Sequence, residues 1–118
     1  MAQHNETGKE GEEMAIAFLR KNNYVIIETN WRFRKSEIDI IVRKKGVLAF
    51  VEVKTRETSF FQEPEKAVTK TKQKMILKGA NEYVQNLEDD PDIRFDIIAI
   101  TFNPLEINHI EDAFYPLV

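Results

Sequence analysis

The sequence predicts an α/β domain with one mixed β-sheet flanked by helices. Two long segments have the apolar spacing of amphipathic helices, and the segments around them are short apolar or alternating runs typical of strands. The predicted order is helix, three strands, helix, strand and a short final strand (αβββαβ(β)). With 118 residues, 42% of them hydrophobic and 31% charged, the chain is expected to form a single globular domain over residues 1–118.

The first helix is predicted over residues 7–21, where Thr7 and Glu10 have the spacing of a capping box. Glu12 is in line with the apolar stripe of this helix, so one interpretation points its carboxylate along the core-facing side. The other interpretation is a first-turn glutamate that favours the helix dipole. A strand is predicted next, from residue 24 to about residue 31.

Residues 36–56 are predicted to form a β-hairpin that is closed at Lys45-Gly46. A two- or four-residue loop keeps the apolar residues of both strands aligned, and in that register Asp39 lies opposite Glu52. Two carboxylates about 5 Å apart repel each other by about 3 kcal/mol at an effective dielectric constant near 20. Such a pair is usually tolerated when a cation lies between the two groups.

The two faces of this hairpin differ in character. One face is apolar throughout and comprises Ile38, Ile40, Val42, Val47, Ala49, Val51 and Val53. The other is apolar in its middle and charged at its open end, where Glu37, Asp39, Glu52 and Lys54 gather. Because a solvated strand would scatter its polar residues along the whole face, this cluster predicts a functional site at the open end.

A second helix is predicted from Pro64 to about Leu87, followed by strands over residues 94–101 and 106–110. Lys72 interrupts the apolar stripe of this helix, so it either reaches inward or extends to solvent, which is the simpler interpretation. Phe60-Phe61 precedes the helix and has three possible roles: stacking on an unpaired base, contact with a dimer partner, or plain loop packing.

Composition excludes several kinds of site. The chain has no cysteine and only two distant histidines, so a bound metal is expected to be a hard cation with oxygen ligands. It has neither a long apolar run nor a signal-peptide pattern, so we expect a cytoplasmic protein without membrane association. The net charge of −3 argues against strong non-specific nucleic-acid binding. Residues 31–56, however, hold eight Lys/Arg against three Asp/Glu, and residues 66–78 hold five lysines and no acid.

Asp39, Glu52 and Lys54 have the D-x(12)-E-x-K spacing of the PD-(D/E)xK nuclease signature. Mg²⁺ prefers carboxylate oxygens and keeps waters in its other positions, and a bound ion would polarise a phosphate and generate hydroxide near neutral pH. Lys54 shares a strand face with Glu52, where it would orient or deprotonate a water or offset charge on the phosphorane. The carbonyl of Val53 and the carboxylate of Glu12 are candidates to complete the metal site.

Short motifs along the chain match those of a known family. They are Gly11–Ala15, Asn30–Arg32, Glu37–Asp39, Phe50–Arg56, Ala67–Thr69 with Lys72-Gln73, Arg94–Asp96, Ile107–Ile110 and Ala113-Phe114. On these motifs the chain resembles the YraN-like family of small bacterial proteins over nearly its whole length. That family is similar in fold to restriction endonucleases and to archaeal Holliday-junction resolvases, so the resemblance implies a restriction endonuclease-like fold.

The resemblance also implies a catalytic site made of Glu12, Asp39, Glu52 and Lys54. Lys72 or Gln73 would support that site from the second helix. Ser36 stands where the family usually has glycine, which leaves all the proposed ligands in place.

Three further residues near these motifs have more ordinary interpretations. Glu37 is expected to be a solvated neighbour of the site. Arg56 would pair with a backbone phosphate or equally form an exposed salt bridge. His109 is expected to be a structural hydrogen-bonding residue rather than a catalytic base.

Three functions are compatible with these patterns. The first is an endonuclease that uses Mg²⁺, with Mn²⁺ as a substitute, on structured or branched DNA. The second is a nucleic-acid-binding protein that keeps the fold without cleaving, and the third is a protein-interaction role. The intact Asp39, Glu52 and Lys54 favour the first, and the sequence does not distinguish DNA from RNA. A homodimer is implied only by the resemblance, since resolvases act as two-fold dimers on two-fold junctions.

Overall fold

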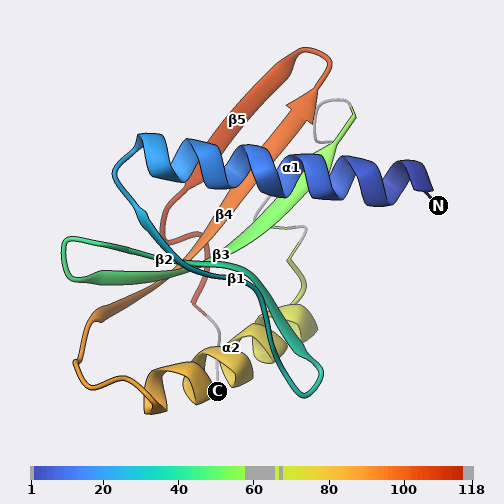
Figure 1. Cartoon of the computed structure of the whole chain (residues 1–118). Coiled ribbons are helices and arrows are strands. Elements are labelled where there is room, and N and C mark those ends of the chain that lie inside the picture. The colour runs from blue at the N-terminus through green and yellow to red at the C-terminus, as the bar shows by residue number, and fades with distance from the viewer. Residues whose placement is uncertain (1, 58–65, 67, 116–118) are drawn as a thin grey trace.

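The computed structural model describes residues 2–57, 66 and 68–115, which form a five-stranded mixed sheet and two helices (Figure 1). The elements are α1 (Ala2–Lys21), β1 (Val25–Phe33), β2 (Ser36–Lys44), β3 (Val47–Arg56), α2 (Lys70–Gln85), β4 (Asp92–Phe102) and β5 (Leu105–Ile110). The strands are arranged in sequence order, with β3 and β4 parallel and the other neighbours antiparallel. The predicted class and element order are confirmed and agree with a restriction endonuclease-like arrangement.

The two helices cover opposite faces of the sheet, and each face has its own core (Figure 1). The buried core on the α1 side comprises Ala15, Leu19, Tyr24, Ile40, Val42, Ala49, Val51, Ile98 and Ile100. The buried core on the α2 side comprises Ile38, Ile41, Leu48, Phe50, Val68, Ile76, Ala80, Phe95, Ile97 and Phe114. Successive residues of β3 and β4 therefore alternate between the two cores, as strand geometry requires.

Helix α1 begins at Ala2, so Thr7 lies inside the helix and the predicted capping box does not mark its start. The residues before Thr7 contain no glycine or proline that would end a helix. Further along, Gly11 is buried, and a Cβ at this position would collide with the side chain of Thr55 on β3. Glycine therefore allows α1 to lie close against β3 at this point.

Helix α2 begins at Lys70, where the side chain of Thr69 accepts a hydrogen bond from the Lys72 backbone N–H at 3.2 Å. Threonine is a favoured residue at this N-cap position. The start predicted at Pro64 and the Phe60-Phe61 pair lie outside the described residues. Neither of the helices in the described part of the chain is long and apolar enough to cross a membrane.

The β2–β3 hairpin has the predicted register. Its ladder runs from Lys44↔Val47 to Ile40↔Val51 and is closed by a two-residue turn at Lys45-Gly46. The φ angles of these two residues are 49° and 81°, and a type I′ turn needs positive values at both positions. The ladder ends one pair before Asp39 and Glu52.

The apolar face predicted for this hairpin is wrong at Ile38, which packs on the α2 side, whereas Ile40 packs on the α1 side. Beyond the end of the β2–β3 ladder, β1 and β2 continue as a two-stranded ribbon, here called the β1–β2 arm. This arm curls towards α2 (Figure 1). There the Ser36 hydroxyl donates a hydrogen bond to the Met75 carbonyl at 2.7 Å. The strand can approach α2 closely because residue 79 of the helix is glycine. A Cβ at this position would lie only 3.1 Å from the Ser36 Cβ.

We expect Gly11→Ala to lower the free energy of unfolding by about 1–3 kcal/mol, because its methyl group would overlap with Cγ2 of Thr55. The same substitution should cost much less in a Thr55→Ser background, which lacks that methyl group. Gly8→Ala is the matched control, since a Cβ there meets no atom within 4 Å and alanine favours the helix by up to about 1 kcal/mol. Urea denaturation of Gly11→Ala, Thr55→Ser, the double variant and Gly8→Ala measures the coupling between positions 11 and 55. A loss in Gly11→Ala that Thr55→Ser leaves unchanged would contradict the packing argument.

Candidate functional site

Asp39 and Glu52, the two predicted carboxylates, lie where the β2–β3 ladder ends. Oδ2 of Asp39 accepts a hydrogen bond from the Val53 backbone N–H at 2.8 Å. The carboxylate therefore satisfies a backbone donor of β3 that the ladder no longer pairs. Glu52 is the residue before Val53 and is only 6% exposed. The end of the ladder thus brings the two acids together in a buried environment.

Burial raises the pKa of both carboxyl groups. The pKa of Glu52 rises from 4.5 to about 7, first through burial and then through the negative charge of Asp39, while Lys72 and Lys54 partly lower it. The pKa of Asp39 is also raised by burial, against the opposing effects of the Val53 hydrogen bond and Lys72. The folded protein therefore resists ionising both groups at once.

Two lysines reach Glu52 from different elements. The Nζ of Lys54, on β3, lies 3.9 Å from Oε1 of Glu52, and the Nζ of Lys72, on α2, lies 3.5 Å from the same oxygen. The contact with Glu52 agrees with the inward interpretation of Lys72, whose side chain is still 42% exposed to solvent. The buried carboxylate attracts its ammonium group towards the end of the β2–β3 ladder.

Asp39 also lines a cleft of about 240 Å³ between α1 and the open end of the hairpin. The residues around this cleft are Gly8, Glu12, Asn30, Glu37, Asp39, Val53 and Thr55. The pKa of Glu12 is raised by its partial burial and then by the charges of Asp39 and Glu37. This position agrees with the inward interpretation of Glu12. The first-turn alternative is excluded because α1 begins at Ala2.

The supporting residues Glu37 and Arg56 have contacts of their own. Glu37 forms an ion pair with Arg32, its cross-strand partner on β1, with 3.5 Å between Oε2 and Nη2. Arg56 is exposed and donates a hydrogen bond to the Thr55 carbonyl at 2.8 Å. Glu37 therefore adds negative charge at the rim of the cleft, and Arg56 lies at the end of β3 beyond the carboxylates.

Lys72, not Gln73, is the residue of α2 for which the structure shows a contact with Glu52. The Gln73 side-chain amide donates a hydrogen bond to the Val68 carbonyl at 3.1 Å. This bond satisfies a carbonyl just before the start of α2. Gln73 therefore supports the helix that carries Lys72.

Asn30 lines the cleft but was not among the predicted site residues. The flanking pairs Thr29↔Ile40 and Trp31↔Ile38 place it opposite Asp39 across the β1–β2 arm. Its φ angle is 50°, in a left-handed region that asparagine tolerates better than most residues. The signals in the sequence were its place near the end of a predicted strand and in the Asn30–Arg32 family motif, neither of which indicated a role in the site. Its position depends on the β1–β2 register, which is shifted by a bulge between Ile26 and Glu28.

His109 belongs to a separate buried network around Asp96, which agrees with its predicted structural role. The Asp96 carboxylate accepts hydrogen bonds from Arg94 at 2.9 and 2.8 Å, from His109 at 2.8 Å and from the Asp112 N–H at 3.1 Å. Burial alone would raise the pKa of Asp96, but the hydrogen bonds from His109 and Arg94 outweigh it and hold the pKa below its usual value. Arg94 also donates to the Tyr24 hydroxyl at 2.6 Å, so the network joins β4, β5 and the residue preceding β1.

Among the described residues, no three His, Asp or Glu side chains come close enough together to hold a metal ion as a group. Glu12 is placed with Asp39 and Glu37 at the cleft, whereas Glu52 is paired with the two lysines. The predicted set of three carboxylate ligands is therefore not assembled in this conformation. Asp39 and Glu52 alone still fit Mg²⁺, because this ion commonly takes one or two protein carboxylates and fills its shell with water and phosphate oxygens.

The chain matches the uncharacterised protein family UPF0102 over residues 11–100. It belongs to this family. UPF0102 proteins of Flavobacterium psychrophilum, Christiangramia forsetii and Flavobacterium johnsoniae are 49%, 45% and 42% identical to it, and each alignment covers 98% of both chains. The predicted YraN-like membership is thereby confirmed, and all the predicted site residues lie within the matched range. The descriptions of the UPF0102 family and of these relatives name no activity, so nuclease activity stays a prediction.

We expect Glu52→Gln to stabilise the metal-free protein at high pH. Because the folded-state pKa of Glu52, about 7, exceeds the usual value of 4.5, the folded state holds more protons than the unfolded state between these values. Stability should therefore fall as the pH rises through this window, and Glu52→Gln removes the effect. Urea denaturation in EDTA should show a gain of about 3 kcal/mol at pH 8 and almost none at pH 4.

The control is Glu13→Gln, which changes an exposed carboxylate on α1 and should have little effect at either pH. If Glu52→Gln were less stable than the wild type at pH 8, the ion pairs with Lys54 and Lys72 would outweigh the cost of burial. That outcome would contradict the electrostatic account of the pair.

Proposed function

We propose that this chain is a magnesium-dependent endonuclease of the PD-(D/E)xK type that hydrolyses phosphodiester bonds in structured or branched DNA. The observation that supports this best is the pair formed by the buried Glu52 and the half-buried Asp39, with Lys54 beside it. Holding two acids together in a buried place costs stability, and perturbed groups of this kind are concentrated at functional sites. A protein that only binds nucleic acid would have no use for this cost, so cleavage is favoured over that alternative.

Asp39 and Glu52 would hold the Mg²⁺ ion, for which Mn²⁺ is the expected substitute. The Val53 carbonyl is a further oxygen donor that we propose for the same site, and Glu12 would join it after moving from its present place in the cleft. When bound, the ion would polarise the phosphate and lower the pKa of a bound water. The Val53 N–H donates a hydrogen bond to Oδ2 of Asp39, so Oδ1 is the oxygen that we propose would bind the ion.

The other contributions come from side chains of the chain itself. Lys54 is largely buried beside Glu52, so its ammonium group is positioned in advance to offset negative charge that develops on the phosphate. Lys72 adds a second positive charge from α2. Glu12 and Asn30 line the cleft through which water would reach Asp39. A two-fold homodimer would place two such sites on a two-fold junction, and we retain it as part of the proposal.

The first test is a cleavage panel of four-way, forked and linear DNA with Mg²⁺ or Mn²⁺. Wild type should cut at least one substrate and should lose activity in EDTA. Asp39→Ala and Lys54→Ala should each lower the rate by about 100-fold or more, because each removes a charged group from the reacting centre. Glu13→Ala, on the exposed side of α1, should cleave like the wild type. Equal cleavage rates for wild type, Asp39→Ala and Lys54→Ala would contradict the catalytic assignment.

A second test measures metal binding through stability. Mg²⁺ should raise the melting temperature of the wild type at pH 8. At a hundred-fold excess over Kd, the free energy of unfolding should rise by about 2.7 kcal/mol. Asp39→Asn should respond much less, since it removes one of the two proposed ligands. In EDTA this variant should melt above the wild type, because its amide oxygen can still accept the Val53 hydrogen bond while the repulsion is gone. A drop of several degrees in EDTA would show that Asp39 is a structural hydrogen-bonding residue instead.

A further inference from the structure

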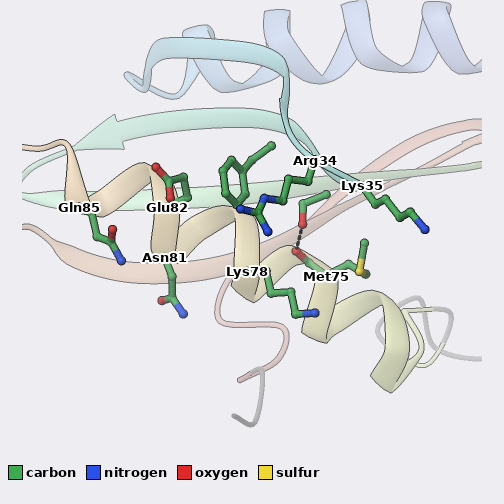
Figure 2. Close-up of a pocket in the computed structure, with 9 residues that line it drawn as sticks. Arg34, Lys35, Met75, Lys78, Asn81, Glu82 and Gln85 are labelled. Carbon is green, nitrogen blue, oxygen red and sulfur yellow. Dashed lines mark hydrogen bonds between the residues drawn. The ribbon is translucent and has the colours of Figure 1, made fainter.

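A second groove, of about 560 Å³, lies between the β1–β2 turn and α2 (Figure 2). One wall is the turn, with Arg34 and Lys35, and the other is a face of the helix. The charged and amide residues that line it are Arg34, Lys35, Lys78, Asn81, Glu82 and Gln85. None of them belongs to the carboxylate site, so the groove needs an explanation of its own.

The charge of this groove is opposite to that of the whole chain. Its lining has three cations and one carboxylate, Glu82, whereas the net charge of the protein is −3. The lysine-rich residues 66–78 lead into the same wall, and they include no acid. Positive charge concentrated on one face of an acidic protein favours an anionic partner. The amides of Asn81 and Gln85 add neutral hydrogen-bond donors to the same wall.

The guanidinium of Arg34 lies over an aromatic ring beside the groove. The φ angle of Arg34 is 56°, and its guanidinium carbon lies 5.2 Å from the centre of the Phe33 ring. The Phe33 ring also stacks on Trp31, with 6.5 Å between the ring centres. Since the aromatic ring is already engaged by these neighbours, the groove offers cations and amides rather than a free surface for base stacking. Arg34 is exposed at the groove, and its planar guanidinium is a group that binds phosphate oxygens in a bidentate manner.

Both walls of the groove lead to the carboxylates. Along β2, Ser36 in the groove is three residues from Asp39, a distance of about 10 Å in an extended strand. Along α2, Met75 in the groove is one helical turn, about 5 Å, from Lys72, which contacts Glu52. The phosphates of a DNA strand advance by about 3.4 Å per step along the helix axis. A strand with its reactive phosphate beside Glu52 and Lys72, on the α2 side of the arm, would therefore have its neighbouring phosphates within reach of the groove.

We infer that this groove binds the phosphodiester backbone of the DNA substrate, about three base-pair steps from the phosphate that is cleaved. The inference rests on the proposed function for the identity of the substrate. Arg34, Lys35 and Lys78 bind phosphate oxygens, and the groove does not read the bases. Such contacts fix the register of a nucleic acid on a protein without selecting its sequence. Glu82 opposes the binding through its negative charge.

The test is the binding of a short fluorescent DNA duplex, followed by anisotropy at several salt concentrations. All proteins carry Asp39→Asn and are kept in EDTA, so that no cleavage consumes the probe. Arg34→Asn and Lys78→Gln should each weaken binding and reduce the slope of log affinity against log salt by about 1. Glu82→Gln should strengthen binding. A duplex of scrambled sequence should bind equally well, because the groove contacts the backbone.

Lys45→Asn is the matched control for Arg34→Asn. Both residues lie in two-residue turns with positive φ, which asparagine tolerates, and both substitutions remove one positive charge. Lys45 lies at the other end of β2, about 30 Å away along the extended strand. Lys45→Asn should therefore leave the slope of log affinity against log salt unchanged. If Arg34→Asn and Lys78→Gln bound like Lys45→Asn, or if the parent protein did not bind the duplex, the inference would be overturned.

Two further comparisons separate this inference from the nuclease proposal. If the groove variants weaken binding but the wild type cleaves no DNA in Mg²⁺, the groove stands as a DNA site and the nuclease proposal fails. If the wild type cleaves and the groove variants bind normally, only the groove assignment fails. An RNA duplex of the same sequence distinguishes the two sources of phosphodiester backbone. Binding of DNA, with or without binding of RNA, supports the inference, and binding of RNA alone overturns it.

Discussion

The hydrogen bond from the Val53 N–H to Asp39 is the interaction on which the candidate site depends. β3 continues beside β4 as far as Arg56, while its ladder with β2 ends at Ile40↔Val51. Beyond that point a side chain of β2 takes over the role of the missing backbone acceptor. The fold therefore brings a carboxylate beside Glu52 by the same contact that ends the pairing of the two strands. An alanine at position 39 would leave the donor unpaired, so this residue serves both the fold and the site.

The electrostatics of the site follow from this placement. Glu52 has a pKa near 7 because burial and Asp39 act together, and two lysines only partly oppose them. A sequence selected for stability alone would replace one of the acids, since buried charges are rarely worth their desolvation cost. Local conflicts of this kind are expected at functional sites, where stability is given up for chemistry. The buried Asp96 shows the contrast, because its partners hold its pKa low and the group acts as a structural centre.

Much of the fold could be predicted because its signals are local. The two-residue turn at Lys45-Gly46 and the period-two pattern of β2 and β3 determine a register, and that register places Asp39 near Glu52. The start of α1 was missed because a plausible cap at Thr7 has no helix breaker before it. The site roles of Asn30 and Lys72 were not determined by local patterns, because Asn30 was only part of a family motif and the stripe of α2 left two directions open for Lys72. They depend on how β1 and α2 are docked on the hairpin, which no short-range spacing encodes.

The β1–β2 arm connects the carboxylates to the groove between the β1–β2 turn and α2. On one side of the arm, Glu37 and Asp39 line the acidic cleft, and on the other, Ser36 and Ile38 pack against α2. Gly79 permits this contact, because any side chain there would press on Ser36 and Ile38. Since packed interfaces transmit small shifts rather than absorb them, a displacement of the arm would move Asp39 and Arg34 together. The distance between Asp39 and the cations of the groove is therefore set by one rigid contact between a hairpin and a helix.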